Sequence, residues 1–99
     1  MATPGSVPQT ARDVVDYADS HAGATRPGYV GGRTFQNDGR GGGQVLPGID
    51  GQGNSITYTE YDTNQLSRGV NRGTERVVMG TDGSAYYTDD HYATFVRLR

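Results

Sequence analysis

Residues 74–88 read Thr-Glu-Arg-Val-Val-Met-Gly-Thr-Asp-Gly-Ser-Ala-Tyr-Tyr-Thr, and this stretch decides the fold. The run 74–79 is rich in β-branched residues and the run 85–88 carries two tyrosines, both of which favour strands. Between them, Thr81-Asp82-Gly83-Ser84 contains the Asp-Gly pair that is a strong signal for a tight turn. The stretch therefore predicts two antiparallel strands joined by a turn.

Two further runs extend this pattern on either side. Residues 56–61 precede the hairpin and are predicted to form the first strand of this half of the chain. Residues 91–97 follow Asp89-Asp90 and are predicted to form its fourth strand. Side chains alternate across a strand, so the run 56–61 has two faces. One face carries Ile56, Tyr58 and Glu60, and the other carries Thr57, Thr59 and Tyr61. The C-terminal half of the chain is thus predicted to be an antiparallel meander.

The N-terminal part predicts one helix over residues 9–21. Val14, Val15 and Ala18, with Tyr17 beside them, form an apolar stripe at helical spacing. Thr10 is the expected N-terminal cap, with Asp13 as its capping-box partner, and Gly23 is the expected stop signal. Residues 1–8 are expected to be a flexible arm, and residues 28–53 are Gly-rich and mostly loop, interrupted by residues 33–37.

These elements predict an α+β fold, in which one N-terminal helix packs on an antiparallel β-sheet of four to five strands. The chain has 99 residues and a mass of 10.6 kDa, so residues 9–99 are expected to form a single domain.

Composition excludes several classes of protein. The chain has no apolar run near the roughly 20 residues that a membrane span needs and no Cys for a disulfide or a thiolate metal site. Its net charge of −2 argues against electrostatic wrapping of duplex DNA. All 9 basic residues are Arg, which reflects either a GC-rich genome or sites that grip phosphate.

Four residues are candidates for chemistry, and each also has a purely structural interpretation. Glu60 in mid-strand is either a solvated position or a base, and Arg72 and Arg76 are either solvated cations or a phosphate site. His91 is either a turn histidine paired with a neighbouring aspartate or an acid that those aspartates help to keep protonated. Taken together, a carboxylate, a histidine and two guanidinium groups on neighbouring strands suit acid–base phosphotransfer, as in RNA cleavage without a metal.

Five segments occur in a characteristic order along the chain: Phe35-Gln-Asn37, Val45-Leu-Pro47, Glu60-Tyr61, Arg72-Gly-Thr-Glu-Arg76 and Asp90-His-Tyr-Ala-Thr-Phe95. With these segments the chain resembles, from about Pro8 to Val96, the microbial guanyl-specific ribonucleases, particularly the small secreted streptomycete enzymes, with barnase a more distant relative.

The resemblance implies a role for each matching residue. Glu60 falls on the general base, His91 on the general acid, and Arg72 and Arg76 on the phosphate-binding arginines. The matches to base-site residues are the aromatics Phe35 and Tyr92, and Gln36 and Asn37, whose main-chain groups contact guanine. The resemblance also implies a 2′,3′-cyclic phosphate intermediate and neither cofactor nor metal.

The chain departs from the family pattern at two points. A longer Gly-rich segment follows Asn37, so the guanine-reading carboxylate of the family is either absent or moved to Asp38. The streptomycete enzymes join their ends by a disulfide, whereas this chain has no Cys, and its termini are expected to be held by packing alone.

The expected function is endonucleolytic cleavage of single-stranded RNA with a guanine preference, by a monomer that does not bind membranes. One alternative is a catalytically idle relative that binds RNA or a protein in the same groove. Another is that the domain is the toxic C-terminal part of a larger secreted effector. The resemblance implies a protein inhibitor or immunity protein of the barstar type as a partner. The location is expected to be extracellular or a target cell, although the chain shows no signal region.

Overall fold

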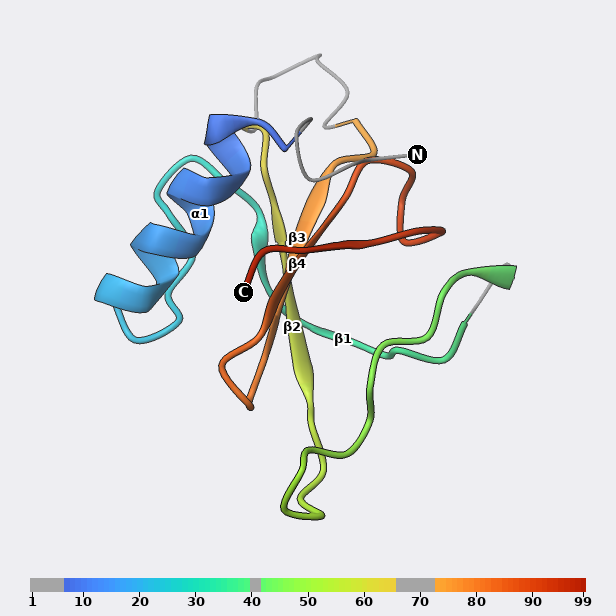
Figure 1. Cartoon of the computed structure of the whole chain (residues 1–99). Helices are drawn as coiled ribbons and strands as arrows, with labels where there is room; N and C mark the ends of the chain where they lie inside the picture. The colour runs from blue at the N-terminus through green and yellow to red at the C-terminus, as the bar shows by residue number, and fades with distance from the viewer. Residues whose placement is uncertain (1–6, 40–41, 66–72) are drawn as a thin grey trace.

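The computed structural model describes residues 7–39, 42–65 and 73–99, and within them the chain forms one helix and a five-stranded sheet (Figure 1). The helix is α1 (Gln9–Ser20), and the strands are β1 (Gly31–Phe35), β2 (Tyr58–Asp62), β3 (Arg76–Gly80), β4 (Ala85–Thr88) and β5 (Val96–Arg97). Neighbours in the order β1-β2-β3-β4-β5 are all antiparallel. The predicted α+β architecture is confirmed.

Helix α1 starts differently from the prediction. Pro8 is the N-terminal cap, in an extended conformation, and no side chain caps the first turn. Because the helix already begins at Gln9, Thr10 lies inside the first turn and the predicted Thr10 cap is wrong. The Ala11 N–H instead donates to the Pro8 carbonyl at 3.1 Å.

The helix ends where Gly23 predicted a stop. The Gly23 N–H donates to the carbonyl of Ala18 at 2.7 Å, and Ala22 has a left-handed φ of 55°. This is the arrangement of a Schellman motif, which satisfies a carbonyl of the last turn and reverses the chain.

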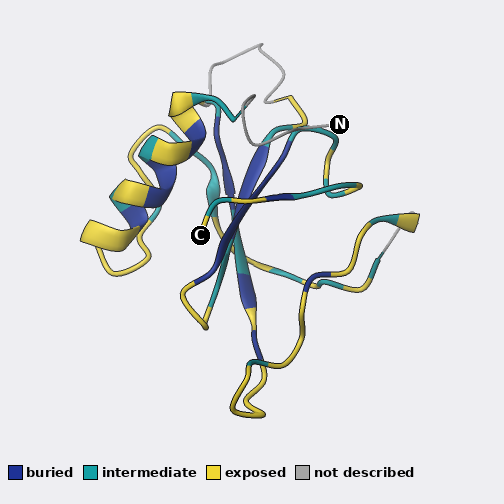
Figure 2. Cartoon of the chain, in the orientation of Figure 1, coloured by how far each residue is buried: buried dark blue, intermediate teal, exposed yellow. Residues whose placement is uncertain are grey.

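The sheet has a helix-side face that holds the larger core cluster. The apolar stripe of α1 packs there against residues of four strands, and Figure 2 shows this buried side of the helix turned toward the sheet. Val7 also packs against this cluster, while residues 1–6 of the expected arm lie outside the described part of the chain. The buried members of the cluster are Ala11, Val14, Val15, Ala18, Tyr61, Val77, Ala85, Tyr87 and Val96.

The opposite face holds a second core cluster, covered by residues 42–56 and by residues 89–95 (Figure 1). Ile56 and Tyr58 lie in this cluster, whereas Tyr61 lies in the helix-side cluster, so the predicted alternation of faces is confirmed for these residues. Phe35, Tyr92 and Phe95 pack against its edge. We call this face of the sheet, which α1 does not cover, the open face.

The predicted strand over residues 91–97 is wrong for most of its length. Only Val96 and Arg97 pair with β4, and residues 89–95 form a loop. His91 and Tyr92 have φ values of 55° and 76°, which a strand does not allow and which side chains as large as Tyr rarely adopt.

The C-terminus is held by more than packing, which corrects the expectation from the missing disulfide. The Arg99 guanidinium forms a two-armed ion pair with the carboxylate of Asp19 near the end of α1. Its Nε donates to the Gly83 carbonyl at 2.7 Å. These contacts lower the pKa of Asp19, chiefly through its hydrogen bond from Arg99. Among the described residues, no helix has the length and apolar character required to cross a membrane.

Candidate functional site

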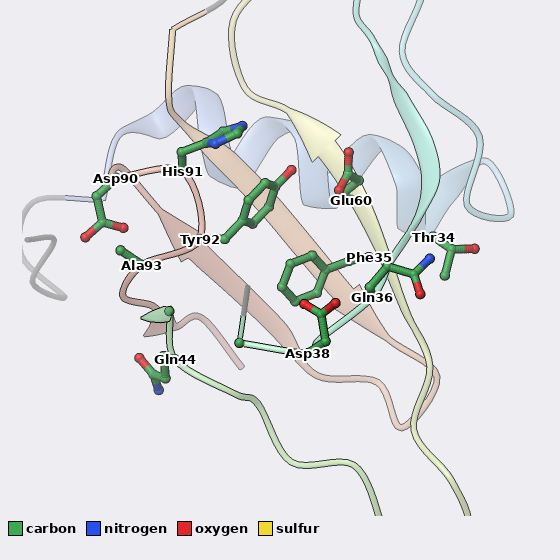
Figure 3. Close-up of a pocket in the computed structure, with 12 residues that line it drawn as sticks. Thr34, Phe35, Gln36, Asp38, Gln44, Glu60, Asp90, His91, Tyr92 and Ala93 are labelled. Carbon is green, nitrogen blue, oxygen red and sulfur yellow. The ribbon is translucent and has the colours of Figure 1, made fainter. Parts of the chain in front are cut away.

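A cavity of about 590 Å³ lies on the open face of the sheet. Its walls come from β1, from the segment that follows β1, from β2, and from the loop after β4 (Figure 3). Six of the residues singled out from the sequence line it. They are Phe35, Gln36, Asp38, Glu60, His91 and Tyr92.

Glu60 lies in the middle of β2, as predicted. Its side chain is 17% exposed, and its Oε1 atom lies 3.1 Å from Nη2 of Arg33. Arg33 is directly opposite Glu60 in the β1–β2 register. The carboxylate therefore faces the cavity with a guanidinium partner that the sequence did not single out.

Tyr92 occupies the centre of the site. Its ring stacks on that of Phe35, with a centroid distance of 4.8 Å and an interplanar angle of 27°. Its hydroxyl points toward Glu60 in Figure 3 and interacts with the side chains of both Glu60 and Arg76. Burial, followed by the nearby Glu60 carboxylate, raises the pKa of the Tyr92 phenol, which therefore stays neutral at physiological pH.

His91 is exposed and borders the cavity from the loop after β4. Its ring centroid lies 4.9 Å from that of Tyr92, and its backbone N–H donates to the Thr74 carbonyl at 3.1 Å. The Asp90 carboxylate points away from the imidazole in Figure 3, which corrects the expectation that it pairs with His91.

Asp90 instead organises the loop that carries His91. Its carboxylate accepts from the backbone N–H and the hydroxyl of Thr94 at 2.9 and 2.6 Å, and from the Thr88 hydroxyl at 2.8 Å. Burial raises the pKa of Asp90, but these hydrogen bonds outweigh it and lower the pKa to about 2. Short side-chain bonds to nearby backbone compete with strand formation, which explains why residues 91–95 leave the sheet.

Arg76 is buried and is not among the residues that line the cavity, although its side chain interacts with Tyr92. Its side chain is 6% exposed, and its Nε lies 3.0 Å from Oδ1 of Asp62. Its Nη1 donates to the carbonyls of Gly73 and Glu75 at 3.1 and 2.7 Å. The structure thus places Arg76 beside Tyr92, with most of its donors bound by the protein itself. Arg72, the other predicted phosphate ligand, lies outside the described residues.

The segment after β1 is fixed at both ends. The side-chain amide of Asn37 donates to the Leu46 carbonyl at 2.9 Å, and its oxygen accepts from the Leu46 N–H at 2.7 Å. Asn37 itself has a left-handed φ of 53°. Its side chain therefore closes the loop, while the neighbouring Gln36 and Asp38 line the cavity.

The other end of that segment is joined to the histidine loop. The Gln44 N–H donates to the Ala93 carbonyl at 2.9 Å, and its side-chain oxygen accepts from the Phe95 N–H at 3.0 Å. A Cβ at Gly43 would lie 2.6 Å from the Tyr92 carbonyl, so only glycine permits this approach. Sequence reasoning missed both residues. The only signal was the run of glycines 41–43, which does not show what it packs against.

The site's donor set does not suggest a metal centre. Among the described residues, no three His, Asp or Glu side chains cluster as metal ligands. A carboxylate, an imidazole and a phenol around one cavity are instead the groups that proton-transfer chemistry uses.

Comparison with known proteins places the chain in a family. A family model described as ribonuclease matches residues 2–99. A ribonuclease of Heyndrickxia coagulans is 41% identical over 71 residues, which are 71% of this chain and 55% of that protein. A ribonuclease of Bacillus intermedius is also 41% identical over 71 residues, which are 37% of its length. The match thus spans only about a third to half of these relatives.

A solved structure shares the fold. The crystal structure of ribonuclease Sa2 with guanosine-2′-cyclophosphate has a TM-score of 0.58 and 28% sequence identity, covering 94% of this chain and 87% of the other. The chain belongs to the barnase-like family of microbial ribonucleases, as its motifs indicated.

Proposed function

We propose that this chain is a guanine-preferring endoribonuclease that cleaves single-stranded RNA by transesterification through a 2′,3′-cyclic phosphate. The observation that carries the proposal is that Glu60 and His91, brought from distant parts of a ribonuclease-family sequence, border one cavity with Tyr92 between them (Figure 3). Such an arrangement supplies a base and an acid for the two ends of one displacement.

In the proposed reaction the Glu60 carboxylate accepts the proton of the 2′-hydroxyl. The 2′-oxygen then forms a bond to phosphorus, and the bond from phosphorus to the 5′-oxygen breaks. The His91 imidazolium donates its proton to that departing oxygen. Arg72, and Arg76 through the part of its guanidinium that is directed at Tyr92 rather than at Asp62, Gly73 and Glu75, stabilise the charge that develops on the phosphorane oxygens.

For base recognition we propose the cavity-lining residues Phe35, Gln36, Asp38 and Tyr92, together with the main chain of Asn37. Guanine presents two donors, N1–H and N2–H₂, on one edge, and one carboxylate can accept from both. Asp38 lines the cavity together with Phe35 and Gln36, which supports its role as that acceptor (Figure 3). The guanosine-2′-cyclophosphate in the ribonuclease Sa2 structure supports a guanosine ligand for this fold.

The biological setting is part of the proposal. We propose that the protein acts as a monomer, outside the cell or after delivery by a larger effector, and that a barstar-type inhibitor covers the same cavity. The bacterial ribonucleases among its relatives support a bacterial origin for this activity.

The proposal is tested by incubating the protein with a single-stranded RNA and, separately, with GpA and ApA, all in excess EDTA. We expect the RNA to be cleaved and GpA to be turned over faster than ApA. An idle binding module would retain RNA in a gel-shift assay and leave it intact, which would contradict the proposal.

A further inference from the structure

Arg33 is a feature of the open face that the proposed mechanism does not yet use. It lies on β1 directly opposite Glu60, and its Nη2 approaches Oε1 of Glu60 at 3.1 Å. Its side chain is 54% exposed.

A β-bulge brings Arg33 to this position. The register changes from Gly31 opposite Tyr61 to Arg33 opposite Glu60, so that Gly32, with a φ of 82°, is an extra residue. Because side chains alternate along a strand, an uninterrupted β1 would turn Arg33 toward the helix-side face. Bulges often re-aim side chains next to active sites.

The Gly31-Gly32 pair makes this bulge feasible. A Cβ at Gly31 would lie 2.9 Å from the ring Cδ2 of Tyr61, and the left-handed φ of Gly32 favours glycine. Because the Arg33 side chain is more than half exposed, its ion pair with Glu60 contributes little to stability, and stability alone does not explain why the strand is distorted to form the pair. A role for Arg33 in holding the Glu60 carboxylate explains the distortion.

We infer that Arg33 is a positioning residue that fixes the carboxylate of Glu60 for proton transfer. The inference rests on the proposed function. A carboxylate offers two oxygens, and a guanidinium bound at Oε1 leaves Oε2 for the 2′-hydroxyl of the substrate.

Arg33 is better placed for this than Tyr92, whose hydroxyl also interacts with Glu60. Arg33 is held on a paired strand, whereas Tyr92 belongs to the loop 89–95.

The test compares wild type, Arg33→Ala, Glu60→Gln and the double variant on GpA. We expect Arg33→Ala to lower kcat by roughly 10- to 100-fold, the value of one hydrogen bond to a charged group, with KM nearly unchanged. Arg33→Lys should recover much of the loss. In the Glu60→Gln background, Arg33→Ala should have little further effect because it acts through Glu60.

Arg12→Ala is the matched control, because it removes one positive charge from an exposed position of α1 and should leave turnover unchanged. Thermal unfolding of Arg33→Ala should match wild type. A full effect of Arg33→Ala in the Glu60→Gln background, an unchanged kcat or a raised kcat each overturns the inference. A wild type that cleaves no RNA overturns the proposed function and the inference with it.

Discussion

Glu60 and His91 are the residues on which the proposed chemistry depends. Glu60→Gln and His91→Ala should each lower kcat/KM by roughly 10²–10⁴-fold, the usual scale for losing one acid–base group. The fold should persist, because His91 is exposed and Glu60 lies at the edge of the cavity. The check is steady-state kinetics on GpA beside circular dichroism of each variant. Near wild-type turnover by either folded variant would contradict its assignment.

Asp38 is the residue that the proposal assigns to base recognition. Asp38→Asn should narrow the guanine preference, because an amide offers one acceptor oxygen where the carboxylate offers two. The measurement is the ratio of kcat/KM for GpA and ApA in wild type and variant. Asp16→Asn, an exposed position of α1, is the matched control for the loss of one negative charge. An unchanged ratio in Asp38→Asn would show that another residue reads the base.

Arg76 is a buried residue of the framework as well as a candidate phosphate ligand. Arg76→Ala should lower the free energy of unfolding by about 3–5 kcal/mol, because it leaves Asp62, which is 1% exposed, without its guanidinium. Arg76→Lys should lower the free energy of unfolding by a smaller amount, because lysine keeps the positive charge but lacks the planar guanidinium group. Urea unfolding measures both. A change below about 1 kcal/mol in Arg76→Ala would show that the ion pair is not a stabilising contact.

At the scale of elements, the loop 89–95 depends on Asp90, and this makes its stability depend on pH. The pKa of Asp90 is about 2 in the folded protein, below the roughly 3.9 of an unfolded aspartate. Its contribution to stability is therefore complete above about pH 5 and is lost as the pH falls from about 4 toward 2.

Asp90→Ala should thus be less stable than wild type by about 1–2 kcal/mol at pH 7, the scale of losing a side-chain cap. The difference should shrink as the pH falls through 4 toward 2. Chemical unfolding of both proteins between pH 2 and pH 7 measures it. A difference that stays constant over this range would indicate that Asp90 acts through packing rather than through its charge.

The same loop shows where prediction from the sequence ends. Strands β2, β3 and β4 follow from alternation and from the Asp-Gly turn, because both signals are local. Residues 91–97 carry the same aromatic and β-branched composition. Their conformation is decided by the hydrogen bonds of the Asp90 side chain, and the amino-acid composition of the segment does not reveal such hydrogen bonds.

The site was predictable to a similar extent. Motif resemblance found Glu60, His91, Phe35 and Tyr92, and the structure gathers them at one cavity. Arg33 could not be found in this way, because its position depends on a bulge that shifts the register by one residue. The buried setting of Arg76 likewise depends on its partner Asp62, which only the β2–β3 pairing reveals.

In the whole molecule, the two faces of the five-stranded sheet differ in what they carry. Its helix-side face carries the larger core, and its open face carries the smaller core and the cavity. Without a disulfide, the C-terminus is anchored to α1 by the pair of Arg99 and Asp19. Substitutions at the cavity rim can therefore change activity while the larger core keeps the fold intact.

The most direct test of the central claim is to map the products of a defined single-stranded RNA digested in excess EDTA. The proposed mechanism uses only an internal nucleophile and protein groups, so cleavage should persist without divalent metal. The fragments should end in 2′,3′-cyclic phosphates, predominantly after guanosine, and single-stranded DNA of the same sequence should stay intact because it lacks the 2′-hydroxyl. Loss of activity on chelation, fragments with 5′-phosphates, or cleavage of the DNA would contradict the account.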